Sequence, residues 1–191
     1  YRLTGFNGRQ SGFNHRFGKV DLDRDFEVHH AFDAVGATPG DHRPEALADE
    51  IDAVNERVYD TVNNGVYKAG FATKQAAYER NVKALFESLD WLEQRLEGRE
   101  FLVGDVLTEA DIRLYTTLAR FDAVYHGHFK CNVRRIVDYP NLSRYLAALY
   151  AMDGFGETTD LLHIKHHYYE SHPSVNPTRI VPVGPATLSF S

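Results

Sequence analysis

Apolar residues recur at intervals of three and four through most of the chain, which is the period of one face of an α-helix. Within residues 44–71 this pattern predicts a long amphipathic helix that is interrupted near 63–65. Residues 73–98 carry a second stripe, which predicts a second helix ending at Gly98. We expect these two helices to pack antiparallel through the positions Leu47, Ile51, Val54, Val58, Val62, Ala77, Val82, Leu85, Leu89, Leu92 and Leu96.

A third helix has the most distinct start signal in the chain, within "FLVGDVLTEADIRLY" at 101–115. Thr108 is predicted as its N-cap, and Asp111 follows three residues later, where its carboxylate can close a capping box. The residues behind this start are apolar on most sides, so we expect a central, buried helix. The predicted role of Thr108 and Asp111 is therefore structural.

The flanking segments differ in pattern from the helical middle of the chain. Further helices are predicted after Pro140 and within 158–172. The four prolines of 173–191 exclude a continuous helix there and predict an extended strap that buries Ile180 and Val183. Residues 1–33 lack a clear period and contain two similar pieces, "GFNGR" and "GFNHR". The pattern thus predicts an all-α domain of five to seven helices over 34–172, between an irregular segment, 1–33, and a tail, 173–191.

Composition narrows the class of protein. Hydrophobic residues make up 43% and charged residues 25%, as in ordinary globular proteins. The net charge of −6 argues against nucleic acid as a partner, and no apolar run is long enough to predict a membrane span. A single cysteine, Cys131, excludes an internal disulfide, and the start of the chain has no apolar signal-peptide core. We therefore expect a cytoplasmic protein.

Four histidines and two tyrosines crowd the stretch "HIKHHYYESH" at 163–172. On a helix, His163, His166 and His167 share one face, a spacing that can hold zinc. Neither a carboxylate of the His-Glu-x-x-His kind nor a nearby cysteine accompanies them. We predict no metal and expect the histidines to pack and hydrogen-bond near a pocket, with a zinc site as the alternative interpretation.

The capping-box stretch resembles the buried sixth helix of the glutathione transferase C-terminal domain. Three further stretches resemble the xi class of that family, the glutathionyl-hydroquinone reductases: "VNNGVYKAGFA", "ADIRLYTTLARFDAVYHGHFKCN" and "HIKHHYYESHPSVNPTRIVPVGP". The resemblance runs from Phe32 to Pro185 and implies the family's helical C-terminal bundle. It also implies glutathione, or a related small thiol, as co-substrate and a homodimer as the assembly.

The resemblance implies reduction of S-glutathionyl-hydroquinones by a thiolate that belongs to a Cys-Pro-Trp motif on a thioredoxin-like domain. This sequence contains no Cys-Pro-Trp. We therefore identify no nucleophile here and expect it on an N-terminal domain outside this sequence, of which residues 1–33 would be a remnant. Cys131 lies in the helical part, and we interpret it as structural.

The same resemblance assigns substrate-binding roles to two tyrosines, Tyr67 and Tyr168, and suggests Tyr125 and Phe71 as walls of their pocket. A phenol suits this site because it donates a hydrogen bond while its ring packs on an aromatic ligand. The expected ligand is a glutathionyl-hydroquinone or a similar aromatic molecule. Two other hypotheses stay open: a non-catalytic helical module that binds a ligand or partner, and a glutathione S-transferase that conjugates electrophiles.

Overall fold

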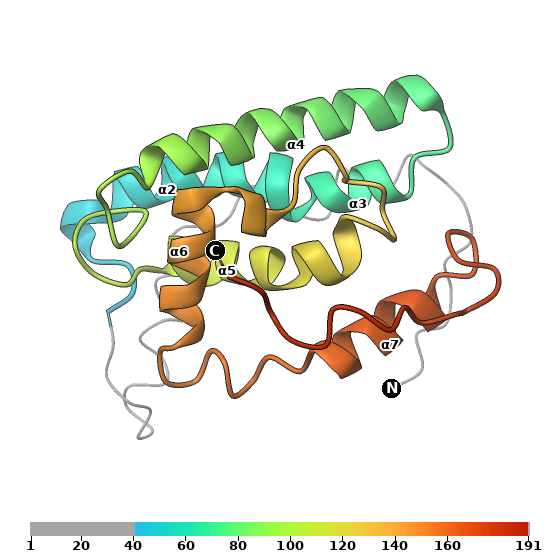
Figure 1. The fold of residues 1–191 in the computed structure, drawn as a ribbon. Coiled ribbons are helices and arrows are strands. Elements are labelled where there is room, and N and C mark those ends of the chain that lie inside the picture. Colours follow the sequence, from blue (N-terminus) through green and yellow to red (C-terminus); the bar gives the residue numbers. More distant parts are fainter. Residues whose placement is uncertain (1–40, 191) are drawn as a thin grey trace, which may run out of the picture. The chain divides into compact units, whose positions relative to one another are not determined.

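A computed structural model describes residues 41–190, and the residues from His42 onward form one compact unit (Figure 1). The predicted irregular segment, 1–33, lies outside the described residues. Within the described part all regular structure is helical, as the sequence pattern predicts. The elements, in order, are η2 (Glu45–Leu47), α2 (Ala48–Val58), η3 (Tyr59–Asn63), α3 (Gly65–Gly70), α4 (Gln75–Arg95), α5 (Glu109–Arg120), η4 (Phe121–Tyr125), η5 (Ile136–Asp138), α6 (Pro140–Tyr150) and α7 (Leu161–Ser171).

The first helical elements follow one another almost end to end, and α4 returns antiparallel along them (Figure 1). The predicted apolar stripes meet in this contact, where Ile51 and Val62 face the core and Leu85, Leu89 and Leu92 are fully buried. Each such side chain stabilises the fold by roughly 1.5–3 kcal/mol relative to its exposed state. Gly98, three residues after α4, has a φ of +68°, which agrees with its predicted role as the helix stop.

The interruption predicted near 63–65 takes the form of a π-helical turn, η3, followed by a new helix start at Gly65. The Asn64 amide donates to the Tyr59 carbonyl at 2.9 Å, a bond that spans five residues instead of four. A second π-helical turn, η4, continues α5, and there the His126 amide donates to the Phe121 carbonyl at 2.9 Å.

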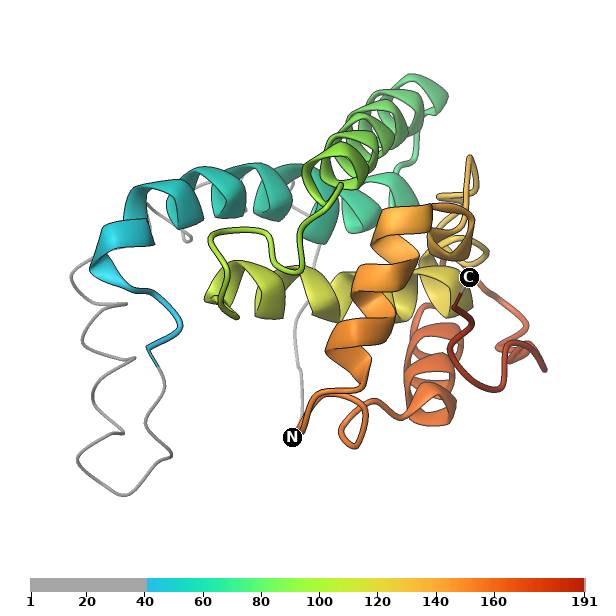
Figure 2. The same cartoon turned by 60° about the vertical axis from the view of Figure 1, so that its left-hand side comes forward.

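Helix α5 lies at the centre of the unit, and α6 crosses it (Figure 2). Its start contains the predicted capping box: the Thr108 amide and hydroxyl donate to Asp111 Oδ2 at 2.8 and 3.0 Å. Asp111 is fully buried, and its Oδ1 accepts the Leu102 amide at 2.9 Å and the Tyr145 hydroxyl at 2.8 Å. One carboxylate therefore joins the loop before α5, the helix itself and α6.

The tail beyond α7 contains no regular element up to residue 190, as its prolines predict. The expected burial of Ile180 and Val183 is wrong, because these side chains are 69% and 96% exposed. The tail is instead attached through its main chain: the buried Lys165 ammonium on α7 donates to the carbonyls of Pro182, Val183 and Pro185 at 2.9–3.2 Å. Since the Val183 carbonyl faces the lysine, the Val183 side chain faces outward.

Candidate functional site: three phenols from three helical segments

Three tyrosines from distant parts of the sequence bring their hydroxyl groups together. Tyr67 comes from α3, Tyr125 ends η4, and Tyr168 lies on α7. The Tyr168 hydroxyl lies 2.5 Å from that of Tyr67 and 2.9 Å from that of Tyr125, while the Tyr67 and Tyr125 hydroxyls are 3.4 Å apart. We call this group the tyrosine cluster. The structure thus unites three of the four residues that the sequence suggested for the pocket.

Aromatic rings surround the hydroxyl groups. The fourth suggested residue, Phe71, follows α3, is 44% exposed and lies with its ring 6.5 Å from that of Tyr67. Phe129, which the sequence reasoning missed, is fully buried and packs 5.5 Å from Tyr67 and 5.6 Å from Tyr125. Phe129 follows Tyr125 by four residues, and because that spacing places two residues on the same face of a helix, it could have indicated Phe129 from the sequence. The result is a polar centre with an aromatic wall.

A glycine lets Phe129 approach the end of α3. A Cβ atom on Gly70 would lie 2.2 Å from Cγ of Phe129, so any side chain larger than hydrogen displaces that ring. Because Phe129 packs against Tyr67 and Tyr125, Gly70 contributes to the shape of the tyrosine cluster without touching a ligand. The stretch "KAGFA" therefore contains Phe71, which is part of the aromatic wall, and Gly70, whose lack of a side chain leaves room for Phe129.

Burial raises the pKa of the Tyr125 and Tyr168 hydroxyls, and the neighbouring tyrosines add to the effect for Tyr125. The charge of Arg120 opposes part of the shift at Tyr168. Both phenols are therefore protonated at neutral pH and act as O–H donors. The two short contacts use two of the three hydroxyl protons, and the third can be donated either across the 3.4 Å contact between Tyr67 and Tyr125 or to an outside acceptor. Tyr67, the least buried of the three, is the most accessible to a ligand.

Cys131 does not join the tyrosine cluster. Its side chain is fully buried, and burial raises the pKa of the thiol to about 12. A thiol with that pKa holds a negligible fraction of thiolate at neutral pH, and the thiolate is the nucleophile. The structural interpretation of Cys131 agrees with this geometry. The described residues therefore provide hydrogen-bond donors and an aromatic wall, and the thiol among them is buried away from the tyrosine cluster.

The histidines of 163–172 divide into two groups. His163, His166 and His167 border a shallow depression on the outer face of α7, and His166 pairs with Glu170 at 3.1 Å. Among the described residues no three His, Cys, Asp or Glu side chains are grouped so that they could hold a metal. His172 instead turns inward beside Tyr168, where its Nδ1 lies 3.1 Å from Nε2 of His128.

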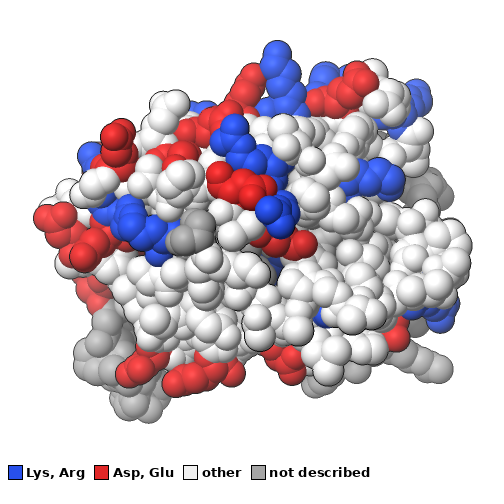
Figure 3. Space-filling model, in the orientation of Figure 1, with Lys and Arg blue, Asp and Glu red and all other residues white. Residues whose placement is uncertain are grey.

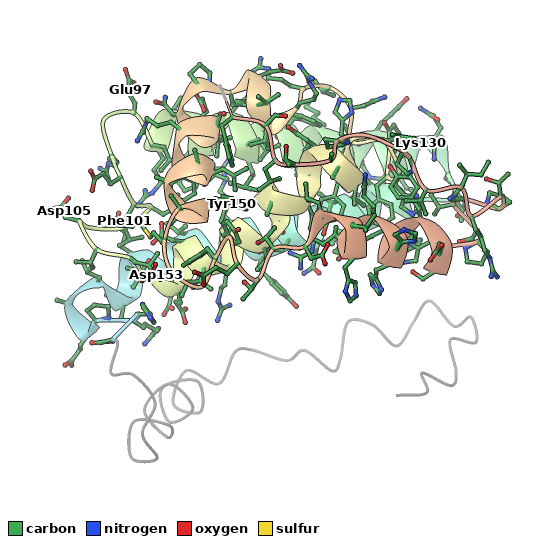
Figure 4. The ribbon with its side chains drawn as sticks, turned by 60° about the horizontal axis from the view of Figure 1, so that its bottom comes forward. Glu97, Phe101, Asp105, Lys130, Tyr150 and Asp153 are labelled. Atoms are coloured by element: carbon green, nitrogen blue, oxygen red, sulfur yellow. The ribbon has the colours of Figure 1, made fainter. Side chains whose placement is uncertain are left out.

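A separate cavity of about 560 Å³ lies between α5 and the N-terminal end of α7. The loop after α6 lines one side of it through Asp153, Gly154 and Phe155, and Figure 4 labels Asp153 in this loop. Tyr115 lines this cavity, and its hydroxyl lies 2.7 Å from Oγ1 of Thr159. Arg120 borders the cavity, whereas none of the three cluster tyrosines lines it.

The chain is similar to glutathione transferases over most of the described residues. Residues 75–148 match the family model "Glutathione S-transferase, C-terminal domain". The structure of glutathione transferase Xi 1 from Trametes versicolor superimposes with a TM-score of 0.82 at 53% identity, over 88% of this chain and 60% of that one. The chain carries a glutathione transferase C-terminal domain of the xi class.

Two bacterial relatives of this xi-class domain are glutathionyl-hydroquinone reductases. PcpF of Sphingobium chlorophenolicum is 65% identical over 156 residues, which are 82% of this chain and 50% of PcpF. YqjG of Escherichia coli K-12, whose structure is known with glutathione bound, has 55% identity and a TM-score of 0.79 over 82% of this chain and 51% of YqjG. The chain spans about half the length of the curated relatives it matches.

These relationships confirm the fold expected from the sequence, a helical bundle of the glutathione transferase type. In this xi-class domain the tyrosine cluster lies where α3, η4 and α7 converge, at one end of the central helix. Within the described residues no helix is both long and apolar enough to cross a membrane.

Proposed function

We propose that this domain binds the hydroquinone part of an S-glutathionyl-hydroquinone and belongs to an enzyme that reduces such conjugates with glutathione. The observation that carries the proposal is the convergence of three phenol hydroxyls beside an aromatic wall. A hydroquinone presents a flat ring with hydroxyl groups, and both features match this site. The two bacterial reductases at 65% and 56% identity support the same substrate class.

The reaction requires a thiolate from a thioredoxin-like domain that accompanies this one. The thiolate attacks the glutathionyl sulfur, the sulfur–carbon bond to the ring breaks, and a mixed disulfide between the enzyme and glutathione forms. The ring carbon keeps the bonding electron pair and takes a proton, which gives the free hydroquinone. A second glutathione then releases the enzyme thiolate and leaves as glutathione disulfide.

In this scheme the tyrosine cluster stabilises the leaving ring. Tyr67, the most exposed member, donates to a ring oxygen, and Tyr168 orients Tyr67 through the 2.5 Å contact between their hydroxyls. Tyr125 holds Tyr168 from the core side, and Phe71 covers the ring face. As hydrogen-bond donors, the phenols stabilise negative charge that develops on the ring as the sulfur leaves.

The domain boundaries and assembly are part of the proposal. We assign 34–172 to the helical domain, 1–33 to a remnant of the preceding domain and its linker, and 173–191 to a tail. The exposed Ile180 and Val183 give the tail an apolar outer face, and Figure 3 shows an area around the tail that is largely free of charged side chains. This exposed apolar face supports a homodimer in which two copies would cover it. The single cysteine is compatible with a reducing cytoplasm.

The test uses the complete gene product that contains this chain, glutathionyl-menadiol as substrate and excess glutathione, with release of menadiol as the readout. Tyr168→Phe removes the central hydroxyl of the cluster, so we expect kcat/KM to fall on the order of 100-fold while far-ultraviolet circular dichroism is unchanged. Tyr169→Phe is the matched control, because the neighbouring hydroxyl contacts the backbone of Ala123 and His128 and no hydroxyl of the tyrosine cluster.

Three results would contradict the proposal in different ways. A complete gene product without a Cys-Pro-Trp domain would favour a non-catalytic binding module. Conjugation of glutathione to 1-chloro-2,4-dinitrobenzene, with glutathionyl-menadiol left intact, would favour a conjugating transferase. Equal losses in Tyr168→Phe and Tyr169→Phe would remove the tyrosine cluster from the mechanism.

A further inference from the structure

Two polar pairs, one helical turn apart, join the same two segments of the protein. The first is the contact between the Tyr125 and Tyr168 hydroxyls at 2.9 Å, and the second is the contact of His128 Nε2 with His172 Nδ1 at 3.1 Å. His128 follows Tyr125 by three residues, and its amide still donates to the Val124 carbonyl at 2.7 Å. His172 follows Tyr168 by four residues, at the end of α7. The imidazole contact therefore fixes how α7 meets η4.

The imidazole pair also supports the aromatic wall of the tyrosine cluster. The His172 ring lies 5.1 Å from that of Phe71, 5.6 Å from that of Tyr168 and 5.7 Å from that of Phe129. The His128 ring lies 5.1 Å from that of Phe129. The imidazole pair thus packs against both the aromatic wall and the ring of Tyr168.

A hydrogen bond between two imidazoles needs one N–H donor and one free nitrogen lone pair. Burial lowers the pKa of His128 to about 4 and also lowers the pKa of His172, so both rings are neutral at pH 7. The charge of Lys130 beside His128 lowers the pKa of His128 further, and the neighbouring His167 on α7 lowers that of His172. Lys130 lies in the loop after η4 (Figure 4). Both neighbours therefore also favour the neutral pair.

We propose that His128 and His172 form a positioning pair, which sets the geometry of the tyrosine cluster by tying the C-terminal end of α7 to the loop after η4. His172 packs against Tyr168 and against the wall residues Phe71 and Phe129. The pair therefore acts on the cluster by holding Tyr168 in position. This inference rests on the proposed function for its catalytic consequence, but its structural part concerns the tyrosine cluster alone.

The first test is independent of activity. Tyrosine labelled with ¹³C at the ζ position reports the hydrogen bonding of each hydroxyl by NMR, and single Phe variants assign the three cluster signals. We expect His172→Leu, which has a similar volume and no polar atoms, to shift those signals. His172→Asn places an amide where Nδ1 was and should restore them. His166→Phe, on the exposed face of α7, is the matched control and should leave them unchanged.

The companion histidine provides a second arm, in case His172→Leu does not fold. His128→Leu should shift the same three signals, and His128→Gln, whose amide reaches the position of Nε2, should restore them. If a folded variant that lacks the imidazole contact leaves the three cluster signals where they are in the wild type, the positioning role is refuted. An equal shift in the Asn or Gln variants also refutes it, because the effect would then follow from ring volume.

The second test measures menadiol release by the complete gene product. We expect His172→Leu to raise KM for glutathionyl-menadiol roughly fivefold, the factor that corresponds to one net hydrogen bond, and His172→Asn to reverse most of this rise. The double variant with Tyr168→Phe should lose no more activity than Tyr168→Phe alone, because the pair acts through Tyr168. Additive losses would contradict the inference.

The two failures can be told apart. An inactive wild-type enzyme whose cluster signals respond to the histidine variants would overturn the proposed function and leave the positioning pair standing. An active wild type whose cluster signals and KM ignore the histidine variants would do the opposite. Both readouts use the same set of proteins.

Discussion

Replacement of Asp111 by alanine should destabilise the domain more than any other single change at the start of α5. The carboxylate accepts hydrogen bonds from the Thr108 amide and hydroxyl, the Leu102 amide and the Tyr145 hydroxyl, and it is fully buried. Alanine leaves these donors without an acceptor inside the protein. Each unpaired buried donor costs about 1–3 kcal/mol, and removal of a buried charge returns part of that cost.

The net expectation is a loss of about 3–5 kcal/mol, out of the roughly 5–15 kcal/mol that holds a typical domain folded. Urea unfolding followed by circular dichroism at 222 nm measures this directly, with the slope m checking that unfolding stays two-state. The matched control is Asp105→Ala, an exposed aspartate in the loop before α5 (Figure 4), for which we expect a change within about 0.5 kcal/mol. Equal free energies of unfolding for the two variants would show that the carboxylate network does not stabilise the fold.

Three further predictions test other parts of the structure. Gly70→Ala places a Cβ atom against Phe129 and should cost about 1–3 kcal/mol; an unchanged melting temperature would mean that Phe129 packs elsewhere. Lys165→Met keeps the aliphatic stem but removes the ammonium that holds the tail carbonyls, so we expect faster proteolytic cleavage in 173–190. Limited proteolysis with mass spectrometry measures this, and a cleavage rate equal to that of the wild type would argue against the attachment. The folded pKa of His128 is about 4 and the unfolded value is near 6.5, so the unfolded state binds more protons between these values. The free energy of unfolding should therefore fall as the pH drops from 6.5 to 4, less steeply in His128→Gln, and parallel profiles would speak against a buried neutral His128.

The helices of this domain were predictable because their signals are local. The spacings of three and four in a stripe such as Leu85, Leu89 and Leu92 match an α-helix and not a strand. The capping box at Thr108 and Asp111 lies within four residues of sequence. The contacts of Asp111 Oδ1 were not predictable, because the Leu102 amide reaches it only when the loop before α5 folds back, and Tyr145 reaches it only after α6 has packed on α5.

The site was harder to predict from residue types alone. Tyr67 and Tyr168 are 101 positions apart, and their spacing contains no signal that their hydroxyls meet. Resemblance to a family supplied them, whereas Phe129 and the contact of His128 with His172 became visible only in the folded chain. For the tail, hydrophobicity was misleading: the prediction assumed that aliphatic side chains anchor a strap, but main-chain carbonyls on a buried ammonium anchor this one.

The π-helical turns make two short segments tolerant of the loss of one residue. Each turn contains one residue more than an α-helical path between the same ends would need. Deletion of one residue from 59–63 would therefore restore a continuous α-helix between the same ends, and Tyr67 would keep its place in the tyrosine cluster. The same deletion within α2 has no extra residue to remove, so it would rotate the residues before it by about 100° relative to Tyr67. A gap of one residue in a related sequence is thus compatible with this site when it falls at η3 or η4.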